Sequence, residues 1–139
     1  MKRSVAAFFA GLVGWILIAS LINRGLRWGL AGYAEAEPSM QFSLAMLLSR
    51  LAMAVVAGIL AGVLVKIIAP ASRMTAWTVG GVWLVLFIPQ HIHLWHVFPI
   101  WYHLFFLLTL APLVALGAYL AGLAGSRAST GTATVGHSQ

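Results

Sequence analysis

Residues 75–103 read TAWTVGGVWLVLFIPQHIHLWHVFPIWYH. The first part of this stretch is apolar over a length that can cross a bilayer. Its second part holds all but one of the chain's five histidines, namely His91, His93, His96 and His103. Ionisable side chains near membrane depth are costly, so they usually face a protein interior or water and mark functional sites. The stretch therefore predicts a membrane helix that leads into a candidate site.

The composition of the whole chain is typical of an integral membrane protein. Of its 139 residues, 62% are hydrophobic and 7% are charged, and the mean hydropathy is +0.99. The net charge of +6 comes from eight Lys and Arg residues that are spread along the chain without a basic run, so nucleic acid is not an expected partner. The absence of cysteine excludes disulfides, thiolate metal sites and thiol nucleophiles.

Four apolar ranges predict an all-α bundle of four transmembrane helices within a single domain of residues 1–124. Each range is about 19–24 residues long, which suffices for a hydrocarbon core of about 30 Å. The ranges are 5–23, 42–65, 75–97 and 100–123. The first is too long for a typical signal-peptide core, so we expect an uncleaved helix. Residues 125–139 are mostly small and polar, and we expect them to form a disordered cytoplasmic tail.

The distribution of positive charge predicts the orientation in the membrane. Cytoplasmic loops of membrane proteins carry an excess of Lys and Arg. With both termini in the cytoplasm, the inner side carries Lys2, Arg3, Lys66, Arg73 and Arg127, and the outer side carries only Arg24 and Arg27. The pattern is similar to that of many short bacterial four-span proteins, so we expect the bacterial inner membrane.

The connection of residues 24–41 is the only loop long enough to hold structure of its own. Leu26, Leu30 and Tyr33 recur at helical spacing, and Trp28 lies between them. Aromatic residues of this kind favour the headgroup level of a bilayer. We therefore expect a short interfacial helix between the first two spans, ended by Pro38.

Small residues form stripes on the predicted helices. Such stripes let membrane helices approach closely, either within one bundle or between chains. The packing candidates are Gly11, Gly14, Ala54, Gly58 and Gly62. They predict contacts between helices of one chain. The same faces can instead join copies of the chain in a homo-oligomer or join the chain to a larger membrane complex.

Arg50 shares the small-residue face of the second span, so we expect it to point into the bundle. A lone charge there needs a carboxylate, carbonyl groups or water. Glu35 and Glu37 are the only acidic side chains of the chain, and both belong to the outer loop. They are the candidate carboxylate partners of Arg50, which can otherwise snorkel outward.

The histidines give a composite candidate site near the outer ends of the last two spans. If the helix continues past Pro89, His93 and His96 lie on one face, with Gln90 on the same side. His103 faces them across the hairpin, and His91 points away. The predicted site is therefore His93, His96 and His103, with Gln90 and Arg50 beside them.

Three interpretations of this site remain open. The histidines can belong to an interfacial belt of amphipathic rings with the surrounding aromatic residues. Alternatively, three imidazoles can bind zinc or copper, with Met46 and Met53 as further soft ligands. The third interpretation is a haem held between two histidines, although a short hairpin leaves little room for a porphyrin.

The sequence favours no enzymatic activity. It has no GxSxG, GxGxxG, Walker or HExxH motif, and its two acids lie in one loop. We expect a small non-enzymatic membrane protein that acts as an accessory protein or binds a ligand or partner through the outer polar cluster. The alternative is a metal- or haem-binding protein that uses the same histidines.

Overall fold

The computed structural model describes residues 2–72 and 74–133, and all regular structure within these ranges is helical. The helices are α1 (Lys2–Gly29), α2 (Tyr33–Ala36), α3 (Leu44–Ile68), α4 (Met74–His93) and α5 (Ile100–Ala133). Of these, α1, α3 and the Ile100–Arg127 part of α5 are long and apolar enough to cross a membrane. The predicted all-helical membrane architecture is confirmed at this level.

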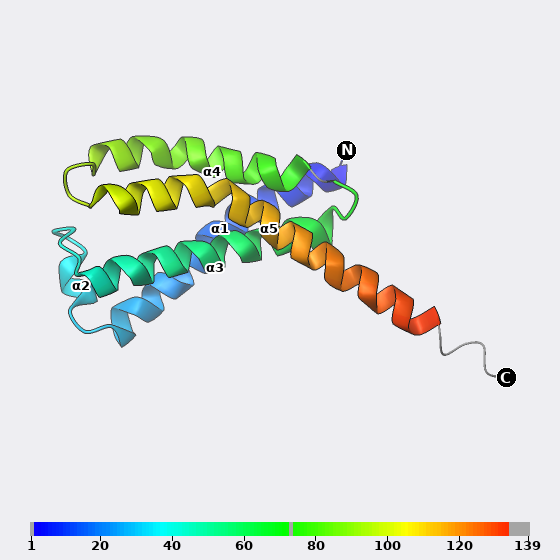
Figure 1. Cartoon of the computed structure of the whole chain (residues 1–139), viewed down its shortest axis with the longest axis horizontal. Coiled ribbons are helices and arrows are strands. Elements are labelled where there is room, and N and C mark those ends of the chain that lie inside the picture. Colours follow the sequence, from blue (N-terminus) through cyan, green and yellow to red (C-terminus); the bar gives the residue numbers. More distant parts are fainter. Residues whose placement is uncertain (1, 73, 134–139) are drawn as a thin grey trace.

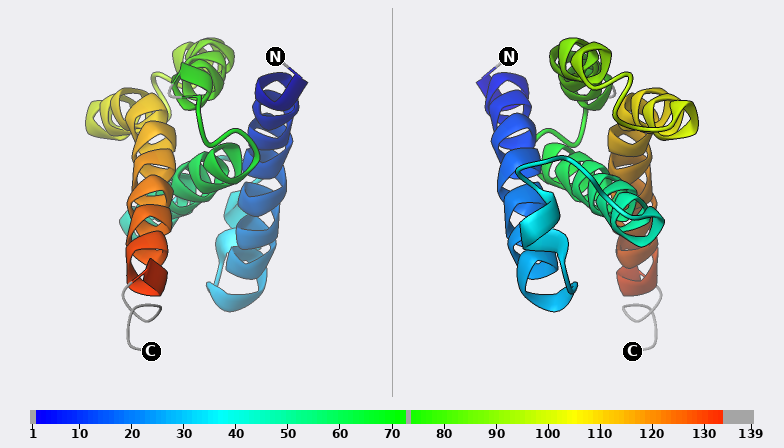
Figure 2. Two further views of the ribbon diagram at one scale, coloured as in Figure 1. Left: turned by 90° about the vertical axis from the view of Figure 1, so that its right-hand side faces the viewer. Right: turned by 90° about the vertical axis from the view of Figure 1, so that its left-hand side faces the viewer.

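The four long helices alternate in direction (Figure 1). One end of the bundle, which we call the α2 end, holds α2 and the turn between α4 and α5. The opposite end, which we call the α1-start end, holds the beginning of α1 and the connection between α3 and α4. Helix α3 lies between α1 and α5, and α4 packs against α5 and α1 (Figure 2). The chain thus brings every long helix against at least two others.

Glycine allows α3 and α5 to cross at very short range. A Cβ added at Gly62 would overlap the carbonyl oxygen of Val114, and one added at Gly117 would overlap the carbonyl oxygen of Ile59. The small residues singled out in the sequence all lie at buried helix contacts: Gly11, Gly14, Ala54, Gly58 and Gly62. Close backbone approach of this kind is how membrane helices gain packing energy.

Large apolar side chains cover much of the outer surface of the bundle. Leu21 is 70% exposed, Leu108 is 71% exposed and Phe9 is 59% exposed. Contiguous apolar surface on this scale is rare on a water-soluble monomer and is typical of a face that contacts lipid. Burial therefore agrees with the hydropathy of the three long helices.

The helix boundaries of the first connection differ from the prediction. The first predicted span ends at residue 23, but α1 continues to Gly29 and includes Leu26. No proline interrupts this segment, and Gly25 is tolerated inside the helix. The predicted loop helix is consequently reduced to the single turn of α2.

The ends of the last two helices also differ from the prediction. Helix α4 ends at His93 rather than at residue 97, because residues 94–98 form turns before Pro99. Helix α5 continues to Ala133, so the prediction of disorder is wrong for residues 125–133. That segment lacks proline, so the helix can continue through it from the apolar part of α5. The remainder of the predicted tail, residues 134–139, lies outside the described residues.

Candidate functional site

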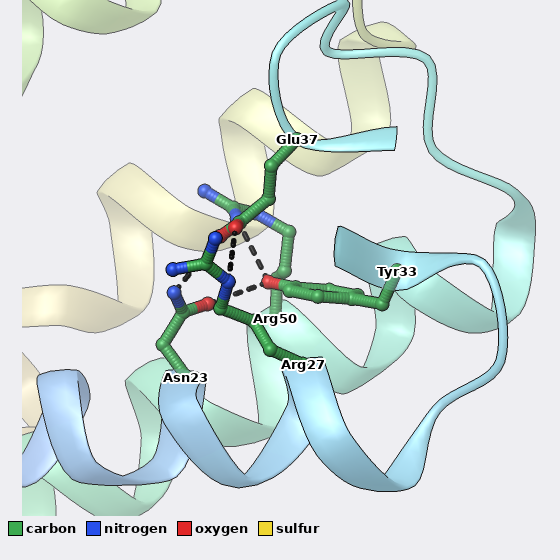
Figure 3. A network of polar contacts seen from close by, with 5 residues as sticks. All are labelled: Asn23, Arg27, Tyr33, Glu37 and Arg50. Carbon is green, nitrogen blue, oxygen red and sulfur yellow. Dashed lines mark hydrogen bonds and ion pairs between the residues drawn. The ribbon is translucent and has the colours of Figure 1, made fainter. Parts of the chain in front are cut away.

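A chain of polar contacts joins α1, α2 and α3 at the α2 end (Figure 3). Nη1 of Arg50 donates to the hydroxyl of Tyr33 at 2.9 Å, and this hydroxyl donates to Oδ1 of Asn23 at 2.7 Å. Nδ2 of Asn23 donates to Oε1 of Glu37 at 2.9 Å. Oε2 of Glu37 pairs with Nε of Arg27 at 3.0 Å. Two neutral side chains thus connect the Arg50 cation to a separate ion pair.

The backbone of the first connection places Tyr33 in this network. Gly32 has a φ of 77°, a left-handed conformation that glycine adopts at little cost, and it caps the short helix α2. Tyr33 follows directly and is fully buried. Ser43 then starts α3, where its hydroxyl accepts a hydrogen bond from the backbone N–H of Met46 at 3.4 Å. The segment therefore folds back over the end of the bundle and carries Tyr33 to Arg50.

Arg50 is surrounded by aromatic side chains. Its guanidinium carbon lies 4.7 Å from the centroid of the Phe42 ring, a cation–π distance. Tyr102 on α5 lines the same pocket as Arg50. Nε of Arg50 is buried and has no hydrogen-bond partner. The direct partners of this cation are therefore neutral, and its Nε–H donor has no acceptor.

Neither candidate carboxylate pairs directly with Arg50. Within the described part of the chain the one ion pair joins Arg27 to Glu37, and Arg50 reaches Glu37 only through Tyr33 and Asn23. Glu35 lies on the exposed side of α2. The guanidinium points into the bundle but meets a phenol hydroxyl, because Tyr33 reaches deeper than either carboxylate.

A pocket of about 330 Å³ opens beside this network. Its polar lining includes Arg50, Tyr102, Asn23 and Glu37. Its apolar lining consists of aromatic rings and methionine or alanine side chains: Trp15, Ala19, Met40, Phe42, Met53, Phe87 and Phe106. Nε1 of Trp15 is buried without a hydrogen-bond partner, as is Nε of Arg50. Two unused N–H donors thus belong to side chains that line one pocket.

Burial raises the pKa of the Tyr33 hydroxyl above its ordinary value, and the nearby positive charge of Arg50 opposes this shift. The phenol consequently stays protonated at neutral pH. It can then accept from Arg50 while it donates to Asn23, which is the arrangement observed. The negative charge of this network is therefore that of Glu37, which is paired with Arg27, and Tyr33 adds no charge that would neutralise Arg50.

The structure brings His91 and His103 together. Their Nδ1 atoms lie 2.7 Å apart, and the two residues are 6% and 0% exposed. Trp95 stacks on the His103 ring with a centroid distance of 4.9 Å, and Phe106 lies 4.7 Å from the ring of His91. The prediction that His91 points away from His103 is wrong.

The other members of the predicted composite site lie apart from this pair. Gln90, His93 and His96 are all exposed. No group of three His, Cys, Asp or Glu side chains within residues 2–72 and 74–133 is close enough to hold a metal ion. The helical projection failed because α4 ends at His93, so His96 lies in a turn and does not share a helix face with His93.

The periodicity of α4 contained the signal that identifies His91. The buried face of this helix runs through Ala76, Val79, Gly80 and Trp83, and His91 continues it at helical spacing. Asn23, Tyr33, Tyr102 and Trp15 were not predicted as site residues. Their polar groups meet Arg50 or its pocket through tertiary contacts between different helices, which no local pattern marks.

Comparison with protein-family models, with curated proteins and with solved structures finds no match to this chain. The function therefore has to be argued from the geometry and chemistry of the site.

Proposed function

We propose that the chain is a four-span protein of the bacterial inner membrane, with α4 as the additional span. Helix α4 has 20 residues, which at 1.5 Å per residue reach about 30 Å, the thickness of a hydrocarbon core. It is antiparallel to α5 and parallel to α1, and both of these packing partners are helices that can themselves span. Its polar end carries Gln90, His91 and His93, and α4 is not among the helices that are apolar enough over 18 residues to span on composition alone.

Both termini are cytoplasmic in this proposal, so the α2 end is the outer end. The positive-inside rule supports this orientation. Single cysteines at Ser72 and Glu35 test it, because the chain has no native cysteine. A membrane-impermeant maleimide added outside intact spheroplasts should label position 35 and should label position 72 only after lysis. The reverse pattern would invert the orientation.

The α2 turn occupies the outer headgroup level in this arrangement. Trp28 at the end of α1 is 81% exposed, and Arg24 stacks on its ring at 5.7 Å. An exposed tryptophan beside a cation suits the interfacial region. The short interfacial element predicted from the sequence is thus proposed to be the last turn of α1 together with α2.

The proposed activity is non-enzymatic binding of an anionic amphiphile with a single acyl chain. The observation that carries this proposal is the guanidinium of Arg50, which lines a pocket, has only neutral direct partners and retains a buried free donor. Carboxylates and phosphates are the groups that arginine binds most strongly. An anionic headgroup in the pocket would lie against the guanidinium of Arg50 and balance its charge.

The remaining walls of the pocket suit the apolar part of such a ligand. Trp15, Phe87, Phe106 and Met53 supply aromatic and sulfur-containing surface. A volume of about 330 Å³ is at the lower end of the range for ligand pockets, about 300–1,000 Å³. We therefore assign the headgroup to Arg50 and the start of the acyl chain to the aromatic wall.

Binding of palmitate to the purified full-length chain in detergent micelles tests this function. Radiolabelled palmitate should bind saturably, and methyl palmitate, which has no charge, should not compete. Arg50→Gln should weaken palmitate binding about tenfold or more, because a hydrogen-bonded ion pair is lost.

Arg24→Gln is the matched control, because Arg24 is an exposed cation at the same end and does not line this pocket. It should bind palmitate like the parent. Equal binding by the parent and Arg50→Gln, or equal competition by the methyl ester, would overturn the proposal.

A metal-handling function is the second candidate, and the His91–His103 pair is the observation that favours it. Imidazole nitrogens suit zinc and copper, and two of them face each other at 2.7 Å. A haem between these two rings would need space for a porphyrin plane, which this separation does not leave. Elemental analysis and absorbance of the purified protein test the candidate, with His103→Phe as the variant that should lose any bound metal.

A further inference from the structure

At the α1-start end, far from the Arg50 pocket, the side chain of Lys66 lies between two hollows of the surface. One hollow has a volume of about 470 Å³ and is lined by residues of α3, α4 and α5, and the other has a volume of about 440 Å³ and is lined by α3, α5 and the connection after α3. Both are lined by Lys66, Gly122 and Ser126. The two hollows therefore form one groove that Lys66 crosses, which we call the Lys66 groove.

Glycine at position 122 lets the lysine lie in the groove. A Cβ added at Gly122 would sit 3.1 Å from Cε of Lys66, tighter than ordinary contact. Nζ of Lys66 donates to the carbonyl oxygen of Pro70 at 2.6 Å. An ammonium group has three N–H donors, so this contact fixes the lysine and leaves it able to bind a ligand.

The groove combines this cation with the side chains that favour a membrane interface. Trp77 and Tyr119 line the larger hollow and are 51% and 62% exposed. Amphipathic aromatic rings favour the level of lipid headgroups. Ser72 adds a hydroxyl to the same hollow, where it is hydrogen-bonded to Thr75 at 2.6 Å. Beyond the groove, the last part of α5 extends past the other helices (Figure 1).

The charge at this end selects an anionic occupant. Lys2 and Arg3 begin α1 at the same end, and Arg127 follows the groove on α5. Both acidic side chains of the sequence, Glu35 and Glu37, belong to the opposite end. A phosphate in the groove would therefore meet attractive charge without a nearby carboxylate.

We propose that the Lys66 groove binds the headgroup of an anionic phospholipid of the inner leaflet. The phosphate meets the ammonium of Lys66, and an acyl chain follows the apolar surface of α5 beside Ala115 and Tyr119. The proposal is independent of the ligand assigned to Arg50, because the two sites share no residue. A free phosphate has the same charged group but gains nothing from the apolar wall, so lipid is the favoured source.

Native mass spectrometry of the full chain in detergent micelles tests this site one lipid at a time. Phosphatidylglycerol should remain bound to the parent in preference to phosphatidylcholine of the same acyl chains. Lys66→Gln should weaken phosphatidylglycerol binding about fivefold, the effect expected for one cation near an anionic headgroup. Lys66→Arg keeps the charge and should keep the lipid.

Lys2→Gln is the matched control, since it removes the same charge at the same end but outside the groove. It should change binding less than about twofold, because a single lipid in a micelle offers no charged surface for distant cations. If Lys66→Gln and Lys2→Gln weaken phosphatidylglycerol binding equally, the lipid is held by general attraction to positive charge and the proposed site is overturned. Equal retention of the two lipids, or displacement of phosphatidylglycerol by 10-fold excess inorganic phosphate, would overturn the lipid as its ligand. Circular dichroism of each variant shows that a loss of lipid does not come from unfolding.

Discussion

The α3–α5 crossing and the α2 end hold helices together in opposite ways. At the crossing, backbone meets backbone, because Gly62 and Gly117 each lie against a carbonyl group of the other helix. At the α2 end, long side chains such as Arg50 and Tyr33 make the contacts between helices, and a pocket lies beside them. A backbone contact allows one arrangement only, whereas side-chain bridges can adapt. A binding function is accordingly expected at the α2 end and structural rigidity at the crossing.

Gly62→Leu should have the largest effect on stability. Its side chain would overlap backbone atoms of α5 and force the helices apart, which we expect to lower the free energy of unfolding by about 4 kcal/mol or more. Unfolding by sodium dodecyl sulfate in mixed micelles measures the change. Gly81→Leu is the control, because nothing lies within 4 Å of a Cβ added there. If both variants unfold like the parent, the crossing does not depend on close approach.

Arg50→Glu should have the next largest effect, because it places a carboxylate against phenol and aromatic groups that now surround a cation. We expect a loss of about 3–5 kcal/mol. Arg50→Ala should cost less, about 2 kcal/mol, since it removes the charge instead of reversing it. The same detergent titration compares the two. Parent-like stability of both variants would mean that Arg50 has no structural partner.

Hydropathy and helical periodicity predicted much of the fold. The long helices, the small-residue stripes and the inward direction of Arg50 follow from local patterns, because lipid-facing and buried residues repeat along a helix. The ends of helices depend on weaker effects. The sequence did not predict that α1 continues to Gly29 or that α4 stops at His93, because no proline marks either of these ends.

The candidate site was less predictable, because its contacts join residues distant in sequence. Glu35 and Glu37 were the carboxylate candidates for Arg50, but the fold brings Tyr33 to its guanidinium. His103 was expected to face His93 and His96, and it faces His91. In both cases the residue type was recognised and the partner was not, since partner choice depends on how helices rotate against one another.

His103→Phe probes a polar contact that, unlike the Arg50 network, is sealed from solvent. The substitution keeps an aromatic ring between Trp95 and Phe98 but leaves Nδ1 of His91 without its partner. Losing one member of a buried pair should cost about 1–3 kcal/mol. Detergent-induced unfolding again gives the value.

The double variant His91→Phe/His103→Phe controls for the change in ring chemistry. Replacing both partners leaves no unsatisfied Nδ1 atom, so most of the loss should be recovered. A double variant that is as unstable as the sum of its single changes would show that the two imidazoles do not interact.

Tyr33→Phe should have the smallest effect, although it removes two hydrogen bonds, to Arg50 and to Asn23. The reason is access to water. Arg50 and Asn23 both line the open pocket, so a water molecule can take the place of the hydroxyl, whereas the His91–His103 pair has no such access. We expect a loss of about 1 kcal/mol in the detergent titration, smaller than that of His103→Phe. Tyr119→Phe, an exposed tyrosine on α5, should change stability by less than about 0.5 kcal/mol. If Tyr33→Phe lowers the free energy of unfolding more than His103→Phe does, water does not replace the hydroxyl. The α2 end would then not be more adaptable than the rest of the bundle.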